Sequence, residues 1–392
     1  MPYRQEQAIL RAPPSTIPGP VALFFAAKGG GVQRVCVTIA NSLAARGVNI
    51  TCVVPQPTGP FLGRLSNVTL VDLGTRQAIT LVRRFARYLR EQRPTAVIAA
   101  QQHAIVAAVL ARRLAGVEVF LAAVQHNTLS ELCRQSRRPT VRWLLPSAAR
   151  LLFGRADQLC AVSEGVAADL AAVTGIPVRD IKVVYNPIVT PEIAKQAAVD
   201  SGHAWLDAKN RPVILGAGNL IPIKNFAMLI RAFALVRQAW PVRLVILGEG
   251  EERRKLDRLA RELGVAAELD LPGLVPNPYA FMARADVFAV ASRVEGLPST
   301  IIEALACGCP VVSTDCPSGP AEILQNGRYG RLVPVSDHAA LADAILATLS
   351  ETSNAAELRR RAVDFSVERA VDRYLEILTR RPGPAPGISD KL

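Results

Sequence analysis

Short apolar runs alternate with stretches of helical periodicity along most of the chain. The runs that we expect to form strands are 21–27, 50–55, 96–100, 117–124, 212–218, 243–250, 285–292 and 310–315. Helices are expected between them, among others one that ends at Arg46 and others near 226–238, 251–263 and 299–306. Because parallel strands need a crossover connection, which is usually a helix, this order predicts parallel sheets.

The alternation pauses once, between residues 186 and 210, where the chain contains proline and is only weakly periodic, as a linker is. The 392 residues suffice for two domains. We therefore expect an α/β fold of two doubly wound, Rossmann-like domains that face each other across a cleft. The predicted organisation is a first domain at 17–188, a linker at 189–210, a second domain at 211–365, a helix at 366–380 that crosses back to the first domain, and a disordered tail at 381–392.

The composition is that of a globular protein with reduced thiols. Half of the residues are hydrophobic, so a large core can be buried. None of the seven cysteines forms a C-x-x-C pair, which favours scattered core thiols over a disulfide framework or a zinc site. No apolar run reaches the roughly 18 residues of a membrane span, and the first twenty residues lack the apolar core of a secretory leader. We expect a cytoplasmic protein.

The net charge of +13 comes almost entirely from one half of the chain. Residues 1–200 hold 23 lysines and arginines against 11 acidic residues, whereas residues 201–392 hold 23 against 22. Such asymmetry predicts an anionic partner of the first half: a nucleic acid, a phospholipid surface or an anionic substrate.

Three loops that follow predicted strands carry candidate chemistry, because ligands of open α/β sheets bind beyond the carboxyl ends of the strands. The first holds Gly29, Gly30 and Gly31 and opens a helix whose N-terminus favours anions. It lacks the G-x-G-x-x-G spacing of a dinucleotide site, and a plain turn is the alternative. In the second loop, the lone charged residue is Lys224, which suits an anionic oxygen.

The third loop contains Glu295 and leads into a helix that carries Glu303. Pro298 and Ser299 are suited to a helix start, and the free backbone N–H groups of Ser299 and Thr300 can hold a phosphate. Glu303 lies one turn beyond Ser299 on the same face, among apolar or small residues, and can accept hydrogen bonds from sugar hydroxyls. A solvated glutamate is the alternative.

These loops lie within longer segments that resemble one protein family. The segments are GGGVQRVCVTIANSLAARGVNITCV, QHN at 125–127, CAVSEGVAADL, VVYNP, GNLIPIKNFAMLIRAFALV, RLVILGEGEERRKLDRLARELGV, LPGLVPNPYAFMARADVFAVASRVEGLPSTIIEALACGCPVVSTDCPSGPAEIL and GRYGRLVPVSD. Together they resemble glycosyltransferase family 4 over roughly residues 20–380. That resemblance implies a retaining, generally metal-independent glycosyltransferase of the GT-B fold.

The resemblance implies a donor site in the second domain. Its positions are Gly218, Asn219, Lys224, Leu274, Val275, Glu295, Gly296, Leu297, Ser299, Thr300 and Glu303. In the family the first glutamate contacts the transferred sugar, the second contacts the nucleotide ribose, and the lysine and the helix start hold the diphosphate. Leu274 and Val275 fall where the nucleobase is held, and Gly296 and Leu297 lie beside the donor sugar. Asn219 departs from the family, which usually has arginine there.

The resemblance also implies residues of the first domain. His126 matches a histidine that contacts hydroxyls of the transferred sugar, and a structural histidine at a strand end is the alternative. We therefore expect Glu295, His126 and Lys224 to be catalytic. Gly29, Gly30, Gly31 and Arg34 are expected near the diphosphate and the acceptor.

No cofactor is expected besides the substrate. No D-x-D motif follows an apolar strand, and no histidine or cysteine cluster has metal-ligand spacing, so no metal is expected. His103 is a weaker site candidate, whereas His203 and His338 are expected to be solvated.

The expected substrates are a nucleotide sugar, linked to UDP first and to GDP next, and a lipid-linked or polysaccharide acceptor. Two alternatives remain. One is another GT-B activity, a sugar-nucleotide epimerase or a glycan phosphorylase, and the other is a nucleotide-sugar-binding subunit without activity.

Six arginines between residues 134 and 155 interleave with large apolar residues. A second group, Arg83, Arg84, Arg87, Arg90 and Arg93, surrounds Leu81, Phe85, Tyr88 and Leu89. Such mixtures suit the headgroup boundary of an anionic bilayer. We expect Arg137, Arg138, Arg142 and Trp143 to touch the inner face of the cytoplasmic membrane, with solvated helix faces as the alternative. Nucleic acid is disfavoured because no recognised module accompanies the charge, and nothing indicates an oligomeric state.

Overall fold

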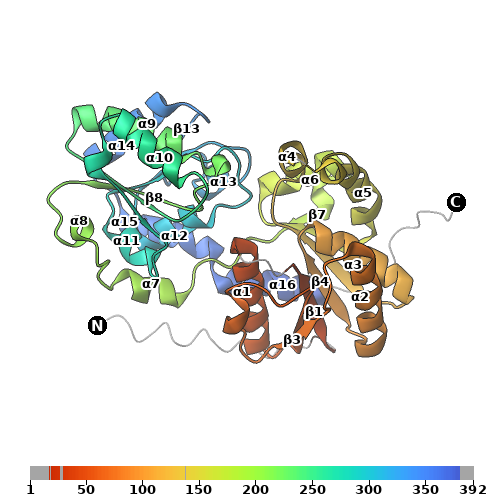
Figure 1. Cartoon of the computed structure of the whole chain (residues 1–392). Helices are drawn as coiled ribbons and strands as arrows, with labels where there is room; N and C mark the ends of the chain where they lie inside the picture. Colours follow the sequence, from red (N-terminus) through yellow and green to blue (C-terminus); the bar gives the residue numbers. More distant parts are fainter. Residues whose placement is uncertain (1–16, 18, 27–29, 137, 380–392) are drawn as a thin grey trace, which may run out of the picture. The chain divides into compact units, whose positions relative to one another are not determined.

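The chain forms two parallel sheets with helices between their strands (Figure 1). The computed structural model describes residues 17, 19–26, 30–136 and 138–379. The strands are β1 (Val21–Phe25), β2 (Ile50–Val54), β3 (Thr69–Asp72), β4 (Ala96–Ala100), β5 (Phe120–Gln125), β6 (Gln158–Ala161), β7 (Ile181–Val183), β8 (Val213–Ala217), β9 (Arg243–Leu247), β10 (Leu269–Gly273), β11 (Val287–Val290), β12 (Val311–Thr314) and β13 (Arg331–Val333). The predicted β-α-β alternation is confirmed.

The helices follow the same alternation. They are α1 (Gly31–Ala45), α2 (Ala78–Gln92), α3 (Gln102–Ala115), α4 (Leu129–Gln135), α5 (Leu145–Leu152), α6 (Glu164–Thr174), α7 (Pro191–Ala197), α8 (Ala204–Asp207), α9 (Phe226–Ala239), α10 (Arg253–Glu262), α11 (Pro278–Arg284), α12 (Ser299–Cys307), α13 (Pro320–Ile323), α14 (His338–Ser350), α15 (Ala355–Ala362) and α16 (Val367–Thr379). Shorter turns are η2 (Leu62–Arg64), the π-helical η3 (Thr140–Leu144), η4 (Phe153–Arg155), η5 (Val178–Asp180), η6 (Pro222–Lys224), η7 (Ala266–Glu268) and η8 (Val363–Phe365).

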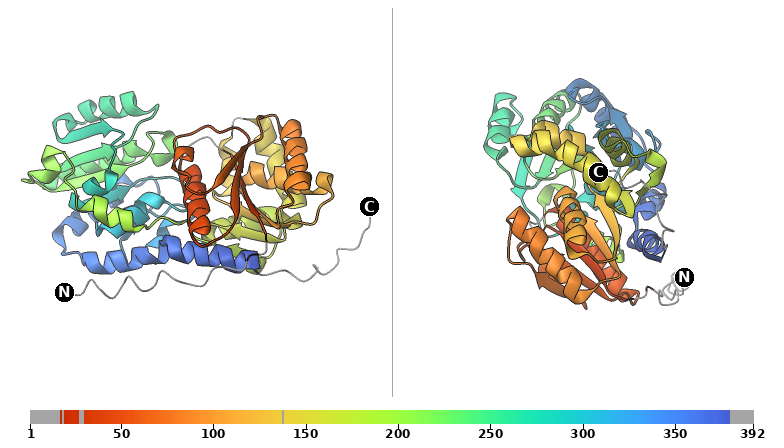
Figure 2. Two further views of the ribbon diagram at one scale, coloured as in Figure 1. Left: turned by 90° about the horizontal axis from the view of Figure 1, so that it is seen from below. Right: turned by 90° about the vertical axis from the view of Figure 1, so that its right-hand side faces the viewer.

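The first sheet has the strand order β3-β2-β1-β4-β5-β6-β7. β1 pairs in parallel with β2 and β4, and all five of its residues are buried, as are those of β4. Burial on both faces explains why a continuous apolar run, rather than an alternating one, marks these strands in the sequence. α2 and α3 pack against each other and remain neighbours in both views of Figure 2.

The apolar residues of α2 belong to the core of this sheet. Phe85 stacks on Phe24 of β1, with ring centroids 4.2 Å apart. Leu81, Tyr88 and Leu89 are buried as well, and the arginines among them are exposed. The second basic cluster is therefore the outer face of an amphipathic helix, which agrees with the alternative of a solvated helix face.

The second sheet has the strand order β10-β9-β8-β11-β12-β13, and each neighbouring pair is parallel. Its core includes Ile214 and Leu244 of the sheet, Phe233 of α9 and Ile345 of α14, all fully buried. α9 packs against both α10 and α14, and the three helices lie together in Figure 1. The loops after β8 and β11 carry the predicted donor residues at the carboxyl ends of these strands.

The described chain divides into two compact units that do not follow the two sheets. One unit comprises the chain up to Val124, Ala148–Cys160 and the segment from Val371 onward. The other comprises Gln125–Ser147 and Ala161–Ala370, so it joins the second sheet with segments that follow β5 and β6. The predicted domain bounds stay predictions, and the predicted tail at 381–392 lies outside the described residues.

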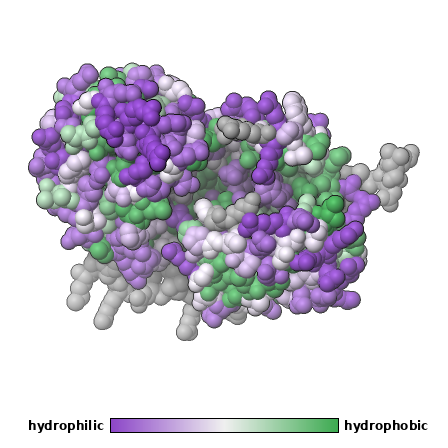
Figure 3. Space-filling model, in the orientation of Figure 1, coloured by the Kyte–Doolittle hydropathy of each residue, from purple (hydrophilic) through white to green (hydrophobic). Residues whose placement is uncertain are grey.

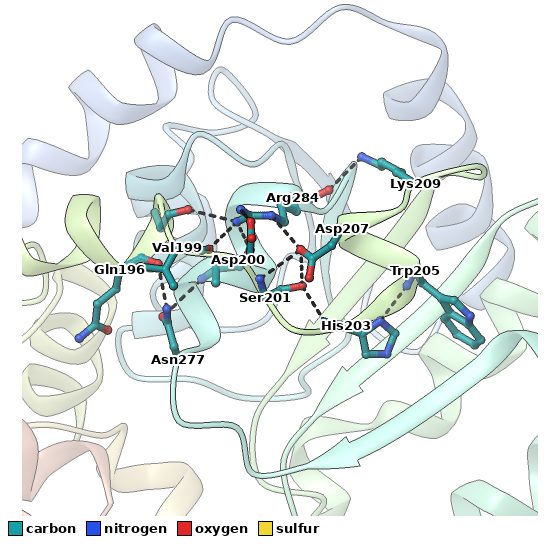
Figure 4. A network of polar contacts seen from close by, with 12 residues as sticks. Gln196, Val199, Asp200, Ser201, His203, Trp205, Asp207, Lys209, Asn277 and Arg284 are labelled. Carbon is teal, nitrogen blue, oxygen red and sulfur yellow. Dashed lines mark hydrogen bonds and ion pairs between the residues drawn. The ribbon is translucent and has the colours of Figure 1, made fainter.

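The segment predicted to be a linker contains α7 and α8 and is tied to α11 by Arg284 and by Asn277, which donates to the Gln196 carbonyl oxygen at 2.8 Å (Figure 4). The Arg284 guanidinium donates to the Val199 carbonyl oxygen at 2.8 Å. It also pairs with Asp200 at 2.8 Å and with Asp207 at 3.0 Å. The weakly periodic sequence of this segment therefore forms short helices that polar contacts hold in place, and not a free connection.

His203, expected to be solvated, is half-buried instead. Its Nε2 lies 2.8 Å from an Asp270 carboxylate oxygen, and its Nδ1 accepts a hydrogen bond from the Trp205 backbone N–H. The ring thus caps the start of α8. His338 is exposed at the start of α14, as expected.

Candidate active site

A lysine and a glutamate from separate loops meet at the carboxyl ends of the second sheet's strands. Lys224 lies in η6 after β8, and Glu295 lies in the loop after β11. Lys224 Nζ is 2.5 Å from Glu295 Oε1, and the side chains are 24% and 11% exposed. The Ser292 hydroxyl donates to the same carboxylate oxygen at 2.6 Å. The pair is therefore oriented by a third side chain and still reaches solvent.

Glycines let the loops after β8 and β9 approach each other through their backbones. A Cβ atom added to Gly248 would lie 1.9 Å from the Gly218 carbonyl oxygen, and one added to Gly250 would lie 2.3 Å from that of Leu220. Gly218 itself has a φ of +154°, which glycine adopts without strain. Its Cβ position is 3.8 Å from the methylene stem of Lys224. This close packing fixes the loop that carries the lysine.

The helix α12 begins four residues after Glu295, at Ser299. Pro298 precedes it and offers no side-chain cap, so the first backbone N–H groups of the helix are left for another acceptor. Ser299 and Thr300 are half-buried, and Glu303 is 4% exposed one turn further along. A helix N-terminus carries partial positive charge and binds phosphates. The arrangement can hold a diphosphate between a lysine and a helix start.

His126 follows β5 and lies in the same compact unit as the Glu295 loop. Its side chain is buried, and burial lowers its pKa to about 4, although Asn186 acts in the opposite direction. Neither ring nitrogen, nor Oε1 of Gln125, completes a hydrogen bond within the described part of the chain. Because buried polar atoms are nearly always paired, these atoms mark a place for a polar ligand or a water molecule.

The strand end at His126 lies directly against the Glu295 loop. A Cβ atom added to Gly296 would sit 2.3 Å from the His126 carbonyl oxygen and 3.4 Å from Asn127 Cα. No side chain fits at Gly296, so the two backbones touch. Histidine, glutamate and lysine thereby come into one neighbourhood.

Two family profiles match consecutive parts of the chain. One, described as Glycosyltransferase Family 4, matches residues 29–191, and the other, described as Glycosyl transferases group 1, matches residues 203–365. The chain belongs to the group 1 glycosyltransferases of family 4. The resemblance read from the sequence is thereby confirmed.

Relatives of known name are similar over different shares of their length. The Campylobacter jejuni N-acetylgalactosamine-N,N'-diacetylbacillosaminyl-diphospho-undecaprenol 4-alpha-N-acetylgalactosaminyltransferase is 34% identical over 232 residues, 57% of this chain and 61% of its own. The Rhizobium meliloti lipopolysaccharide core biosynthesis glycosyltransferase LpsE is 34% identical over 210 residues, 52% of this chain and 59% of its own. The matches thus span about six tenths of these two relatives. LpsD of the same organism is 26% identical over 90% of this chain and 95% of its own.

Solved structures show the same fold. The lipopolysaccharide outer core galactosyltransferase WaaB superposes with a TM-score of 0.73 at 20% identity, covering 92% of this chain and 99% of its own. Anabaena HepE in complex with UDP and glucose gives 0.75 at 21% identity, with the same two coverages. The predicted α/β class, a GT-B fold with two Rossmann-like domains, is confirmed.

Most of the donor positions predicted from the sequence lie close together with His126, and three others follow β8 or β10. The structure brings Lys224, Glu295, Gly296, Leu297, Ser299, Thr300, Glu303, Gly218 and His126 together in one compact unit. Asn219 is exposed in the loop after β8. Leu274, 76% exposed, and the half-buried Val275 follow β10. Whether these residues bind a donor stays a prediction.

The remaining predicted residues lie elsewhere. Gly30, Gly31 and Arg34 start α1 in the other compact unit, and their expected role near the diphosphate and the acceptor stays a prediction. Gly29 and Arg137 fall outside the described residues. Arg138, Arg142 and Trp143 are exposed before and within η3.

Sequence reasoning missed three serines around the Glu295 loop. Ser292 binds the Glu295 carboxylate, and the hydroxyls of Ser163 and Ser318 bind the Gly296 carbonyl oxygen. Ser163 and Ser292 each follow a strand end by two residues, which was the available signal. Ser318 carries no such signal, because only the folded chain brings its loop to Gly296.

No group of three or more histidine, cysteine, aspartate or glutamate side chains is arranged to hold a metal ion within residues 17, 19–26, 30–136 and 138–379. The seven cysteines are buried free thiols, and burial raises the pKa of Cys52, Cys307 and Cys316 to about 12. They are the core thiols that the sequence predicts. No described helix has the length and apolar character of a membrane span.

Proposed function

We propose that this chain transfers a sugar from a nucleotide diphosphate to a hydroxyl of a lipid-linked or polysaccharide acceptor, with retention of configuration and without a metal. The observation that carries this proposal is the Lys224–Glu295 pair beside the uncapped start of α12. Family membership and the names of relatives that act on a diphospho-undecaprenol substrate or in lipopolysaccharide core synthesis support it.

The donor occupies the carboxyl ends of the second sheet's strands in this proposal. Its diphosphate accepts hydrogen bonds from the N–H groups of Ser299 and Thr300 and an ion pair from Lys224. These groups neutralise the leaving diphosphate, a role that a metal ion has in other transferases. Glu303 receives the ribose hydroxyls. UDP is the favoured nucleotide and GDP the next, and the UDP complex of the structural neighbour HepE supports this order.

The transferred sugar lies between Glu295 and His126. The neutral His126 ring can donate through one nitrogen and accept through the other, which suits sugar hydroxyls. The bond from the anomeric carbon to the phosphate oxygen breaks with oxocarbenium character, and the acceptor oxygen bonds to the same face. The acceptor's proton passes to the departing phosphate oxygen, so charge and atoms balance without a covalent enzyme intermediate.

We place the enzyme peripherally on the inner face of the cytoplasmic membrane. Trp143, Leu144 and Leu151 are 69%, 63% and 69% exposed on η3 and α5, with arginines between them. The Arg142 guanidinium lies 5.3 Å from the centre of the Trp143 ring. Exposed aromatic and aliphatic side chains beside arginines suit an anionic headgroup layer and a lipid-linked acceptor.

The first experiment measures the melting temperature with UDP-, GDP- and ADP-sugars, since a ligand of the folded state raises it by mass action. Lys224→Ala and Glu303→Ala should weaken donor binding about tenfold to a hundredfold, as the loss of charged hydrogen bonds does. Lys255→Ala is the matched control, because Lys255 is an exposed lysine of α10 that likewise pairs with a glutamate, Glu252. A wild-type chain that binds none of these nucleotides contradicts the proposal.

Product analysis separates the alternatives. An anomerically retained glycoside, identified by NMR, supports the proposed transfer. Inversion overturns the retaining mechanism, and an epimerised nucleotide sugar assigns an epimerase. A chain that binds the nucleotide sugar but neither transfers the sugar nor slowly hydrolyses the donor is a binding subunit.

A further inference from the structure

Two serine hydroxyls hold one buried carbonyl of the Glu295 loop. The Ser318 hydroxyl donates to the Gly296 carbonyl oxygen at 2.7 Å, and the Ser163 hydroxyl donates to it at 2.9 Å. The two hydroxyl oxygens are themselves 2.9 Å apart. Ser163 is fully buried, and Gly296 is buried as well. All three residues lie in one compact unit, although Ser163 is 133 positions from Gly296 in the sequence.

Glycines make this approach possible. A Cβ atom added to Gly165 would lie 2.7 Å from Ser318 Cα, and one added to Gly319 would lie 2.4 Å from Pro298 Cδ. Ser318 and Gly319 have φ values of +80° and +94°. A serine held in this left-handed region is constrained by its surroundings, and such positions concentrate at functional sites.

The Ser318 loop is tied to α6 at its other end too. Both carboxylate oxygens of Glu322 accept the Glu164 backbone N–H at 2.9 Å, at the positive start of that helix. Ser163 is the N-cap of the same helix and accepts from the Val166 N–H at 3.1 Å. The hydroxyls are therefore mounted on a fixed support rather than on a mobile loop.

The carbonyl that they hold belongs to the peptide between Gly296 and Leu297. In a planar trans peptide the carbonyl and the following N–H point in opposite directions. Fixing the Gly296 oxygen thus fixes the direction of the Leu297 N–H. Glycine has the least restricted backbone of any residue, so the loop would otherwise be free to rotate this peptide.

We propose that Ser163 and Ser318 are positioning residues that aim the Leu297 N–H at the sugar of the bound donor. This inference rests on the proposed function. The diphosphate is held by Lys224 and the start of α12, whereas this N–H acts on the sugar. The serines therefore control discrimination between a nucleotide sugar and the bare nucleoside diphosphate.

The test compares Ser318→Ala, Ser318→Gly and Ser163→Ala with wild type. We expect each to lower kcat/KM about fivefold to tenfold, which corresponds to one lost hydrogen bond. The affinity for the nucleoside diphosphate should stay within about twofold, so the preference for the nucleotide sugar falls. Ser313→Ala is the matched control, because Ser313 is a buried serine whose hydroxyl binds the Thr314 carbonyl.

Two comparisons keep the outcome decisive. Glycine adopts the positive φ at position 318 without strain. Equal losses of kcat/KM in Ser318→Ala and Ser318→Gly therefore assign the effect to the missing hydroxyl. A loss in Ser318→Ala alone assigns it to backbone strain and overturns the proposal. Ser163→Ala also removes the N-cap of α6, so the melting temperature of this variant is measured. If Ser163→Ala does not fold, the Ser318 variants alone decide the outcome. Wild-type selectivity in all three variants overturns this inference and leaves the proposed function intact. A wild-type chain that binds no nucleotide sugar overturns both.

Discussion

At the scale of single residues, burial decides what His126 can do. The ring is neutral above its lowered pKa of about 4, so it can donate and accept at once. Lys224 and Glu295, in contrast, are only partly buried and lie within ion-pair distance of each other. A neutral histidine beside a charged pair suits a site that binds sugar hydroxyls next to a diphosphate.

The pKa of His126 predicts how stability depends on pH. The unfolded chain binds a proton at this histidine below pH 6.5, whereas the folded chain binds it only near pH 4, so the folded state loses stability as pH falls through this interval. The full difference is about 3 kcal/mol below pH 4. We expect His126→Gln to flatten this part of the unfolding free energy, measured in urea at each pH. If the free energy of unfolding changes equally with pH in wild type and in His126→Gln, this prediction is wrong.

At the scale of elements, Arg284 connects α11 to the segment that contains α7 and α8. Its guanidinium reaches backbone oxygens of Ala197 and Val199 and the carboxylates of Asp200 and Asp207 (Figure 4). One planar group with five donors satisfies acceptors that short helices leave open. Together with the Asn277 amide, which donates to the Gln196 carbonyl oxygen, this side chain holds the segment against α11.

Arg284→Ala should loosen residues 197–207 and lower the free energy of unfolding by about 2 kcal/mol, because charged hydrogen bonds to a partly buried group are lost. Amide hydrogen exchange, read by mass spectrometry, should accelerate in that segment. Arg261→Ala on α10 is the control, since this arginine is exposed. Unchanged exchange in 197–207 would show that the segment is held by other contacts.

At the scale of the whole molecule, the charge is distributed unevenly, and the two basic clusters have different structures. The arginines of α2 cover a helix whose apolar side enters the core, whereas η3 and α5 expose Trp143, Leu144 and Leu151. Figure 3 shows hydrophobic surface at the place of α5 in Figure 1. Only the second arrangement leaves apolar side chains for a bilayer.

Reversing charge at Arg137, Arg138 and Arg142 should therefore weaken binding to vesicles that contain anionic lipid and leave nucleotide binding intact. Cosedimentation should fall at least about tenfold, since each basic residue near such a surface contributes about 1 kcal/mol. The matched control reverses Arg254, Arg258 and Arg261, which are exposed on α10 and change the net charge equally. If both triple variants still bind the vesicles as wild type does, these arginines do not contact the membrane, and Arg138 and Arg142 belong to a solvated face.

The sequence by itself determined the class of fold and the family. Strands buried on both faces read as apolar runs, and the loops after them carry the residues that matched the family, because chain order and periodicity are local properties. The spacing between Glu295, in the loop before α12, and Glu303 on that helix follows in the same way, as does the core position of the cysteines. Thus Lys224, Glu295 and Ser299 could all be named without coordinates.

Only the tertiary structure decided which side chains meet. Ser163 and Ser318 converge on Gly296 from distant segments, and His203 is half-buried and paired with Asp270 rather than solvated. The two arginine clusters look alike in sequence, and packing buried the apolar side of one and exposed that of the other. Such outcomes depend on contacts between residues far apart in the chain, which no local pattern of hydrophobicity encodes.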